Sequence, residues 1–596
     1  MDNRDEIETK LKELKNDDES IRRLAAERLG ELRDVKAISG LIDAMYDADT
    51  AVREAVGDAL VAIGGEPVIK RLTEPLRSEN EPARNLACEV LEAIGNQDLD
   101  LILVLMEDAN EDVRKFAADV IGHIKNKEAL PILINSLNDA SPNVVTSVIE
   151  SLGKLADEDA AMPLVNLLTG NFAFKAAVAL GMIRSSKALP ALLDMARDKA
   201  NLARFAAIEA IGNIGNKSAI EELVKLISEE DVLIQKVVLK AIGMMDELWL
   251  EEHVVDFRTL WKEECFMSAL DDSDDDLKRY AILALGVLNL PQGPKRLLDL
   301  LEQENEVLLP FIIHSLVRIG KKDLQAIMDG ITRESYHVKR HMCVVLGDVQ
   351  KNDVIPALMT AAKDENPLVR AAAVHSLGKY EDEKIFDVLK TALTDEDDYV
   401  RKSSADGLGW LGDAKAIDPL ITLLEDPSKD AGESALGSLL MIGGPAVKTN
   451  LLKAASHHKK EVRAYAMYGL GIINGGDVFD LLRAGLNDED SEVRKTAVEA
   501  LGKIAPSHDS IQALKLGFGD SDPKVRSAVL QSLLKLGAED AVDIYKVALR
   551  DPDQWVRFKG VKCLASLKTP QARSALEEIL NEADDLLRSA IEDSLK

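Results

Sequence analysis

A pattern of apolar and polar positions recurs along the chain and predicts its main structural element. In Asp488–Gly502, DEDSEVRKTAVEALG, acidic and hydroxyl side chains come first, and Val493, Ala497 and Leu501 then follow at helical spacing. These three residues line one face of a helix. The acidic start suits a helix N-terminus, where side-chain oxygens cap free amides and negative charge favours the dipole. The pattern predicts an amphipathic first helix, which loosens or turns at Gly502.

A second apolar run follows each copy and predicts a second helix. After the copy that ends at Gly409, the run stops at the turn signal Asp426-Pro427. Its members are Ala416, Ile417, Leu420, Ile421 and Leu424. One such hairpin cannot bury its own apolar faces, whereas stacked copies can. The pattern therefore predicts an all-α solenoid.

The copies can be aligned on an anchor residue seven positions before the Leu of the Leu-Gly step. Most anchors lie 30 to 32 residues apart, but the intervals around Lys429 are 28 and 34, and Gln235 to Lys278 spans 43. This spacing predicts about 19 helical hairpins. Residues 4–15 and 584–595 are expected to form terminal cap helices.

Units of about 31 residues with the pattern D-x-x-(V/I)-R-x-x-A-x-x-x-L-G resemble HEAT-like repeats of the short type found in phycobilin lyase subunits and many prokaryotic scaffold proteins. The resemblance covers nearly the whole chain. Gly64-Gly65-Glu66-Pro67-Val68 and Gly443-Gly444-Pro445-Ala446-Val447 also fit its inter-helix turn. The family implies a right-handed α–α superhelix with first helices outside and second helices lining a concave surface. It implies no single activity, because the repeat specifies a fold.

The repeated arginine of the motif predicts a structural ladder. An acid such as Asp47, Asp139 or Asp395 begins the turns between repeats, and a planar guanidinium can bond both oxygens of a carboxylate. We expect these pairs to fix the register of neighbouring repeats; a functional anion site is the alternative. The ladder arginines are Arg22, Arg53, Arg114, Arg370, Arg401, Arg463, Arg494, Arg526 and Arg557.

One segment interrupts the array near its middle. Residues 247–271 hold about twelve extra residues and are rich in aromatic side chains, although aromatics make up only 4% of the chain. Exposed aromatics are common binding anchors, so Trp249, Phe257 and Trp261 are candidate partner-binding residues. Alternatively, an added short helix packs these rings into a small core. The expected domains are N-terminal repeats 1–246, an insertion 247–270 and C-terminal repeats 271–596.

Composition narrows the class of protein. The net charge of −31 disfavours nucleic-acid binding, which needs Lys and Arg to neutralise phosphates. We expect no membrane insertion and no secretory signal, because the chain has neither a long uncharged apolar run nor a basic start followed by an apolar core. Four scattered cysteines without a CxxC pair favour a reducing compartment. The chain is expected to be cytoplasmic.

The sequence contains no recognisable catalytic constellation. It lacks GxSxG, P-loop and HExxH motifs. The HEAT-like enzyme deoxyhypusine hydroxylase holds iron through His-Glu pairs, whereas here His375 and His123 are followed by Ser376 and Ile124. We expect no catalytic residue, no metal and no cofactor. The alternative is a subunit of an enzyme assembly, such as a bilin-lyase-like or metal-dependent protein-modifying enzyme.

Second helices that line a concave surface would present a varied polar strip to a partner. Such a strip suits one or more protein partners better than a small molecule, which binds in a closed pocket. We therefore predict a non-enzymatic scaffold or adaptor that binds proteins in its concave groove. The candidate residues on second helices are Asn135, Asn166, Asp387, Asp418, Asp480 and Asp543.

Overall fold

The computed structural model describes residues 3–228, 231–303, 305–473, 478–538, 541–580, 583 and 585–595. In these residues it contains 39 α-helices and no β-strand. The chain divides into two compact units, unit 1 (Met1–Gly293) and unit 2 (Pro294–Lys596). Each unit is a stack of helical hairpins, so the predicted all-α solenoid is confirmed.

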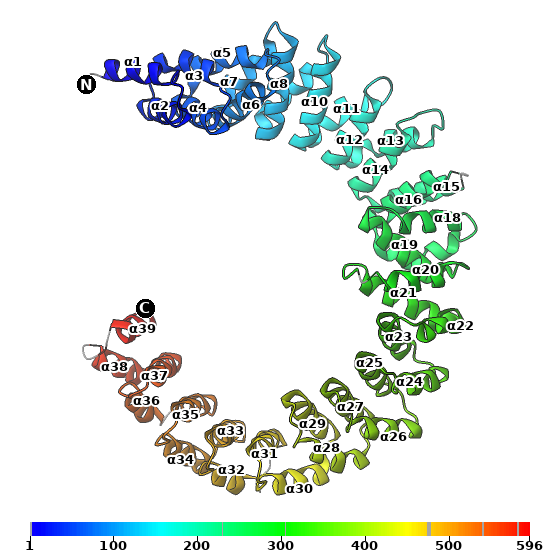
Figure 1. Ribbon diagram of the computed structural model, residues 1–596, viewed down its shortest axis with the longest axis vertical. Helices are drawn as coiled ribbons and strands as arrows, with labels where there is room; N and C mark the ends of the chain where they lie inside the picture. Colours follow the sequence, from blue (N-terminus) through cyan, green and yellow to red (C-terminus); the bar gives the residue numbers. More distant parts are fainter. Residues whose placement is uncertain are drawn as a thin grey trace. The chain divides into compact units, whose positions relative to one another are not determined.

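Unit 1 has one row of first helices and one row of shorter helices (Figure 1). The first helices are α2 (Glu19–Leu32), α4 (Thr50–Ile63), α6 (Glu81–Gly95), α8 (Glu111–Ile124), α10 (Pro142–Leu155), α12 (Ala173–Ile183), α14 (Arg204–Ile214), α16 (Val232–Met245) and α19 (Asp275–Leu288). The others are α1 (Asn3–Glu13), α3 (Ile38–Ala44), α5 (Gly65–Leu76), α7 (Asp100–Leu103), α9 (Leu130–Ser136), α11 (Ala161–Val165), α13 (Leu189–Arg197), α15 (Ile220–Ile227), α17 (Glu247–Glu252) and α18 (Glu263–Leu270).

Unit 2 repeats this arrangement. Its first helices are α21 (Leu309–Lys322), α23 (Tyr336–Val349), α25 (Pro367–Leu377), α27 (Asp398–Leu411), α29 (Lys429–Ile442), α31 (Lys460–Ile473), α33 (Ser491–Leu501), α35 (Pro523–Lys535), α37 (Gln554–Leu567) and α39 (Asp585–Leu595). The others are α20 (Gly293–Leu301), α22 (Gln325–Met328), α24 (Ile355–Ala361), α26 (Glu383–Ala392), α28 (Ile417–Leu423), α30 (Gly444–Ala454), α32 (Phe479–Gly485), α34 (His508–Gly517), α36 (Val542–Ala548) and α38 (Pro570–Ile579).

Short 3-10 helices lead into or extend many of the second helices. They are η1 (Val35–Ala37), η2 (Val104–Glu107), η3 (Lys127–Ala129), η4 (Glu158–Ala160), η5 (Ser186–Ala188), η6 (Lys217–Ala219) and η7 (Val254–Phe257) in unit 1, and η8 (Asp329–Thr332), η9 (Asn352–Val354) and η10 (Ala414–Ala416) in unit 2.

The helix predicted in the repeated motif is α33. The Asp490 side chain caps it by accepting from the backbone N–H of Glu492, which satisfies a free amide of the first turn. Val493, Ala497 and Leu501 are fully buried. The apolar stripe therefore faces the core, as its spacing predicted.

The glycine of the Leu-Gly step has a packing role in addition to the one expected. Gly409 lies within α27, and a Cβ there would come within 2.9 Å of the Cα of Ser438 on α29. Gly212 of α14 meets Ala241 of α16 in the same way, at 2.8 Å. The expectation that the motif glycine marks the end of the first helix is confirmed at Gly502, the C-cap of α33. Inside α27 and α14, the missing side chain of this glycine lets neighbouring first helices approach closely. The turn after α27 is made at Gly412, where φ is +67°.

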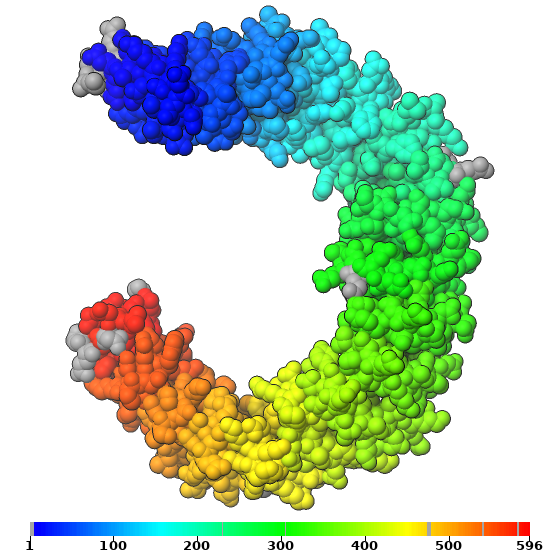
Figure 2. All heavy atoms as spheres, in the orientation of Figure 1, coloured from blue at the N-terminus to red at the C-terminus, as the bar shows by residue number. Residues whose placement is uncertain are grey.

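In unit 2 the first helices occupy the inner side of the curve. Helices α25, α27, α29, α31 and α33 lie inside, and α24, α26, α28, α30 and α32 lie outside (Figure 1). The atoms of unit 2 form a continuous inner edge in the space-filling view (Figure 2). The expectation that second helices line the concave surface is wrong for this unit. The close packing through glycine and small residues draws the first helices together, so their row has the smaller radius.

Candidate partner-binding surface

The repeated arginine links neighbouring repeats through a constant geometry. Arg370 donates from Nε to Asp395 Oδ2 at 2.9 Å and from Nη2 to Oδ1 at 2.8 Å. Its Nη1 reaches back to the carbonyl oxygen of Asp364 at 3.0 Å. One guanidinium thus joins its own turn to the next. The bidentate pairs of this kind are Arg22–Asp47, Arg114–Asp139, Arg370–Asp395, Arg401–Asp426, Arg463–Asp488, Arg494–Asp520 and Arg526–Asp551.

The environment of these carboxylates holds them in the charged form. The hydrogen bonds from Arg22 lower the pKa of Asp47 below its ordinary value. At Asp395, burial by itself raises the pKa, but the hydrogen bonds from Arg370 and from the backbone N–H of Asp397 outweigh that effect and lower it. Both oxygens of each carboxylate are occupied within the chain, which favours a structural role over a free anion site.

Arg53 and Arg557 make the same backbone contact as Arg370. The Nη1 of Arg53 donates to the carbonyl of Asp47 at 2.7 Å, and residue 78, which begins the next turn, is Ser78 where other repeats have Asp. Among the described residues Arg53 forms no ion pair, because Ser78 stands where the other turns have the accepting aspartate. The Nη1 of Arg557 donates to the carbonyls of Asp551 and Pro552, at 3.0 and 3.3 Å.

The ladder is interrupted at α29. The fourth residue of α27 is Arg401, whereas the fourth residue of α29 is Gly432. The alignment on Lys429 was therefore three residues out of register, and Gly432 restores intervals of 31 residues on both sides. The space that an arginine side chain would occupy is filled by Tyr465 of α31. A Cβ on Gly432 would lie 2.9 Å from Tyr465 Cε2, and the Tyr465 hydroxyl donates to the Lys429 carbonyl at 3.2 Å.

An open pocket of about 790 Å³ lies beside this interruption, on the exposed faces of α29, α31 and α33. We call it the Tyr465 pocket. Its floor is apolar and its rim carries carboxylates and one lysine. The lining residues are Asp426, Pro427, Lys429, Glu433, Leu436, Gly437, Leu440, Glu461, Ala464, Tyr465, Tyr468, Ile472, Glu492, Thr496 and Glu499.

Large apolar and aromatic side chains continue along the first helices beyond the pocket. Tyr399, Trp410 and Met441 are exposed on α27 and α29. Trp410 contacts His375 of α25 edge-on, with ring centroids 4.6 Å apart. Sequence reasoning missed these residues because it assigned the first helices to the outer side. The sequence did hold a signal for them, because these large side chains occupy positions of the repeat outside the buried apolar stripe.

The candidates on second helices are exposed but do not lie on this surface. Asn135, Asn166, Asp387, Asp418, Asp480 and Asp543 are all solvent-exposed. The four acids belong to α26, α28, α32 and α36 of unit 2, and the labelled second helices of that unit follow the outer row (Figure 1).

The aromatic side chains of the added segment in unit 1 differ in how deeply they are buried. Trp261 is buried, and its ring lies 5.3 Å from that of the fully buried Phe266. Trp249 and Phe257 are half-buried and stacked, 5.7 Å apart at 20°. Trp261 is thus not an exposed anchor, because the added helices α17 and α18 pack it into a small core. Trp249 and Phe257 keep part of their surface exposed.

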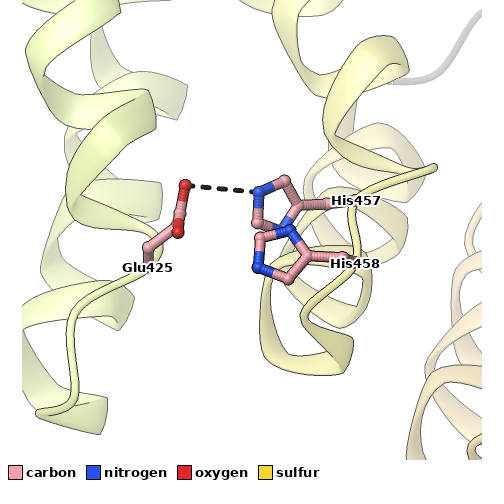
Figure 3. Close-up of side chains that lie close together, drawn as sticks. All are labelled: Glu425, His457 and His458. Carbon is pink, nitrogen blue, oxygen red and sulfur yellow. Dashed lines mark ion pairs between the residues drawn. The ribbon is translucent and has the colours of Figure 1, made fainter.

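Glu425, His457 and His458 place three potential metal ligands close together (Figure 3). His457 Nε2 lies 3.2 Å from Glu425 Oε1, and Lys459 Nζ lies 3.2 Å from Oε2. The backbone N–H of Lys459 donates to His457 Nδ1 at 3.2 Å, so the ring proton of a neutral His457 lies on Nε2. Neither nitrogen then offers a lone pair to a cation, and the ammonium of Lys459 already neutralises the carboxylate. The group is a hydrogen-bonded turn.

The four cysteines are free thiols, of which Cys265, Cys343 and Cys563 are buried and Cys88 is half-buried. Burial raises the pKa of Cys265 and Cys343 to about 12. Such thiols carry almost no thiolate at neutral pH and are inert. In the part of the chain that the structure describes, no helix has the length and apolar character required to cross a membrane.

Comparison with family models supports the repeat assignment along most of the chain. A model described as HEAT repeats matches residues 7–92, 99–174, 324–406, 386–460, 449–533 and 516–596. A model described as PBS lyase HEAT-like repeat matches residues 203–229.

Curated relatives match parts of the chain. Phycocyanobilin lyase subunit alpha from Picosynechococcus sp. is 30% identical over 187 residues, which cover 31% of this chain and 60% of that protein. Protein YibA from Escherichia coli strain K12 is 28% identical over 130 residues, which cover 21% of this chain and 45% of that protein. The chain therefore spans less than two thirds of either relative.

Solved structures match over more of the chain at low identity. The crystal structure of Kap121p aligns with 99% of this chain and 82% of its own, at 14% identity and a TM-score of 0.40. A crystal structure of importin beta aligns with 99% of this chain and 82% of its own, at 16% identity and a TM-score of 0.36.

Proposed function

The chain belongs to the HEAT-repeat family, and from that premise we propose that it is a non-catalytic scaffold that binds protein partners on the exposed face of its first helices. The observation that carries the proposal is the Tyr465 pocket, which combines tyrosines, aliphatic side chains and carboxylates on three adjacent helices. Tyrosine is enriched where protein partners contribute most of their binding energy. The pocket is also open along the row of first helices, which suits an extended surface of a protein.

The exposed face of the first helices in unit 2 has the composition of a protein interface. Trp410 is 42% exposed, Met441 60% and Tyr468 41%. Large apolar groups on a water-facing surface mark interaction sites when polar residues surround them. Here the surrounding residues include Glu433 and Glu461. The acids Asp418, Asp480 and Asp543 of the outer row do not line this pocket and form the comparison surface for the test.

Two variants with the same change in net charge test the proposal. E433K/E461K/E492K alters the inner row, and D418K/D480K/D543K alters the outer row. Partners that co-purify with the tagged full chain from its native lysate are compared by quantitative mass spectrometry. We expect the inner-row variant to lose the specific partners and the outer-row variant to retain them. If the inner-row variant retains the partners and the outer-row variant loses them, the binding surface lies on the second helices instead.

A second candidate function is that of a subunit in a protein-modifying assembly. The similarity to phycocyanobilin lyase subunit alpha favours it. It predicts that the purified chain retains a chromophore, or binds phycocyanobilin with a change in its visible absorbance. A scaffold without such a role gives no spectral change on mixing.

A further inference from the structure

We infer that the Tyr465 pocket receives a lysine or arginine side chain from an extended segment of the partner protein. The inference rests on the proposed scaffold function and adds the chemistry of the segment that binds. It follows from the shape of the pocket, its floor, its charge and one intramolecular contact.

Gly437 of α29 lines the pocket, and Gly432 of the same helix lets Tyr465 border it. Gly432 occupies the position that is arginine in the ladder, and Tyr465 of α31 packs against it. Gly437 is exposed, and a Cβ at this position would meet no heavy atom within 4 Å. The hollow therefore lies over α29, bounded on one side by the ring of Tyr465.

The floor of the pocket fits the aliphatic part of a long basic side chain. Leu436 is buried, and Leu440 and Tyr465 are half-buried in the lining. Lys and Arg side chains pack their methylene stems along apolar surface while the charged end stays among polar groups. An acidic or short polar side chain would leave this floor uncovered.

The rim carries an excess of negative charge. Lys429 pairs with Glu433 at 3.3 Å, and Glu492 pairs with Lys495 at 2.9 Å. Glu461 and Glu499 form no direct ion pair among the described residues, and their charges act only at longer range, on Lys460 and Lys495. A basic side chain from a partner can therefore pair with these two carboxylates directly. Phosphate groups and acidic segments would be repelled.

One tyrosine ring that lines the pocket already makes a cation–π contact with a lysine of the same chain. The Nζ of Lys503, on the chain after α33, lies 3.9 Å from the ring centroid of Tyr468. Ammonium groups bind aromatic faces in this way through the ring quadrupole. Burial raises the pKa of Tyr465, and the negative charges of Glu433 and Glu461 raise it further. The Tyr465 ring therefore stays neutral, in a field that attracts cations.

The test uses three fluorescein-labelled peptides of sequence Ala-Ser-X-Leu-X-Ser-Ala, in which X is lysine, glutamine or glutamate. Binding to the full chain is measured by fluorescence anisotropy at about 150 mM salt, where long-range attraction by the net charge is screened. We expect the lysine peptide to bind about ten-fold more tightly than the other two. Equal binding of the glutamine peptide would overturn the inference.

Matched variants locate the site. E433K/E461K/E492K should weaken binding of the lysine peptide about ten-fold, which corresponds to about 1.4 kcal/mol, and D418K/D480K/D543K should leave it within about two-fold. G437L fills the hollow without a change of charge and should also abolish tight binding. Y465L should weaken binding about three-fold, whereas Y399L, outside the pocket, should not. Equal losses in both triple variants would show that bulk charge alone attracts the peptide.

The outcomes separate this inference from the proposed function. If native partners are lost from E433K/E461K/E492K while the three peptides bind alike, the scaffold function stands and the basic segment is excluded. If partner capture is independent of the inner row, the proposed function fails. Concentration-dependent self-association that G437L abolishes would identify the occupant as a second copy of this chain and would overturn the inference. Circular dichroism checks that each variant is folded.

Discussion

Arg401 holds Asp426 across the boundary between two repeats. Its Nε donates to Oδ2 at 2.6 Å and its Nη2 to Oδ1 at 2.9 Å, while its Nη1 donates to the carbonyl of Asp395 at 2.9 Å. The carboxylate of Asp395 is in turn bound by Arg370. Asp395 therefore accepts from Arg370 through its carboxylate and from Arg401 through its backbone carbonyl. These bonds connect each repeat to the one before it and the one after it.

The Arg494–Asp520 pair should contribute measurably to local stability. Its side chains are only 14% and 9% exposed, and a hydrogen bond to a charged group contributes about 1.5–3 kcal/mol. We expect R494Q and D520N each to lower the local free energy of unfolding by about 1–3 kcal/mol, and the double variant to lose less than the sum. Hydrogen exchange of the α33 and α35 amides measures this. R483Q, an exposed control on α32, should change it by less than about 0.5 kcal/mol. Additive losses would contradict direct coupling.

Two glycine-to-alanine substitutions should act in opposite directions. At Gly409 the new methyl group meets Ser438 of the next first helix, and we expect a loss of about 1–3 kcal/mol through overpacking. At Gly437 it meets nothing within 4 Å, and we expect a gain of about 0.5–1 kcal/mol from the higher helix propensity of alanine. Chemical denaturation, followed by far-ultraviolet circular dichroism, compares the two. If G409A were also stabilising, the close-contact role of this glycine would be excluded.

Acid should weaken the ladder in a defined range of pH. The pKa of Asp139 is lowered below its ordinary value of 3.8 by the hydrogen bonds from Arg114. A carboxylate whose folded pKa is depressed adds stability above its unfolded pKa and loses it as pH falls through the folded pKa. We therefore expect stability to be constant above about pH 5 and to fall steadily below about pH 4. R114Q should show a smaller acid-dependent loss than the parent. Identical curves for both proteins would argue against the pair as the source.

The two tryptophans of the added segment should differ in their effect on stability. Trp261 is 6% exposed and contacts Phe266, so W261A should cost about 3–5 kcal/mol through the cavity it leaves. Trp249 is half-buried and stacks on Phe257, so W249A should cost clearly less. Thermal melting of unit 1 helices, read by hydrogen exchange, measures both. Similar costs would mean that Trp249 also belongs to the core.

The cysteines should react with iodoacetamide in a fixed order. Cys88 is half-buried, whereas Cys265 and Cys343 are fully buried and burial raises the pKa of each to about 12. At pH 8 we expect Cys88 to be alkylated first, and the two buried thiols to react only after local unfolding. Peptide mass spectrometry over time gives the order. Rapid labelling of Cys265 in the native protein would contradict its burial.

The apolar stripe of the motif was sufficient to predict the element that it forms. Val493 and Leu501 lie on the buried face of α33 because a helix brings residues at this spacing to one side. The role of the motif glycine was not predictable in the same way. Gly409 faces Ser438 from the next repeat, and a contact between residues far apart in sequence leaves no trace in the local pattern.

The candidate binding surface was even less predictable from the local sequence pattern. The sequence identified Asp418 and Asp480 as variable and polar, and both are exposed. It does not place Tyr465 and Gly437 in one pocket, because the spacing of the repeat aligns Lys429 with Arg401. A shift of three residues is nearly one helical turn, so both alignments keep an apolar stripe, and only the packing of α29 against α31 distinguishes them.

The sequence by itself determined the repeating helical hairpin and its approximate number of copies, because both depend on spacing along the chain. The tertiary structure decided which row of helices lies inside unit 2 and where the ladder gives way to a pocket. Curvature depends on how closely neighbouring first helices approach, and that distance is set by facing pairs such as Gly409 and Ser438. Such pairs exist only once the repeats are stacked.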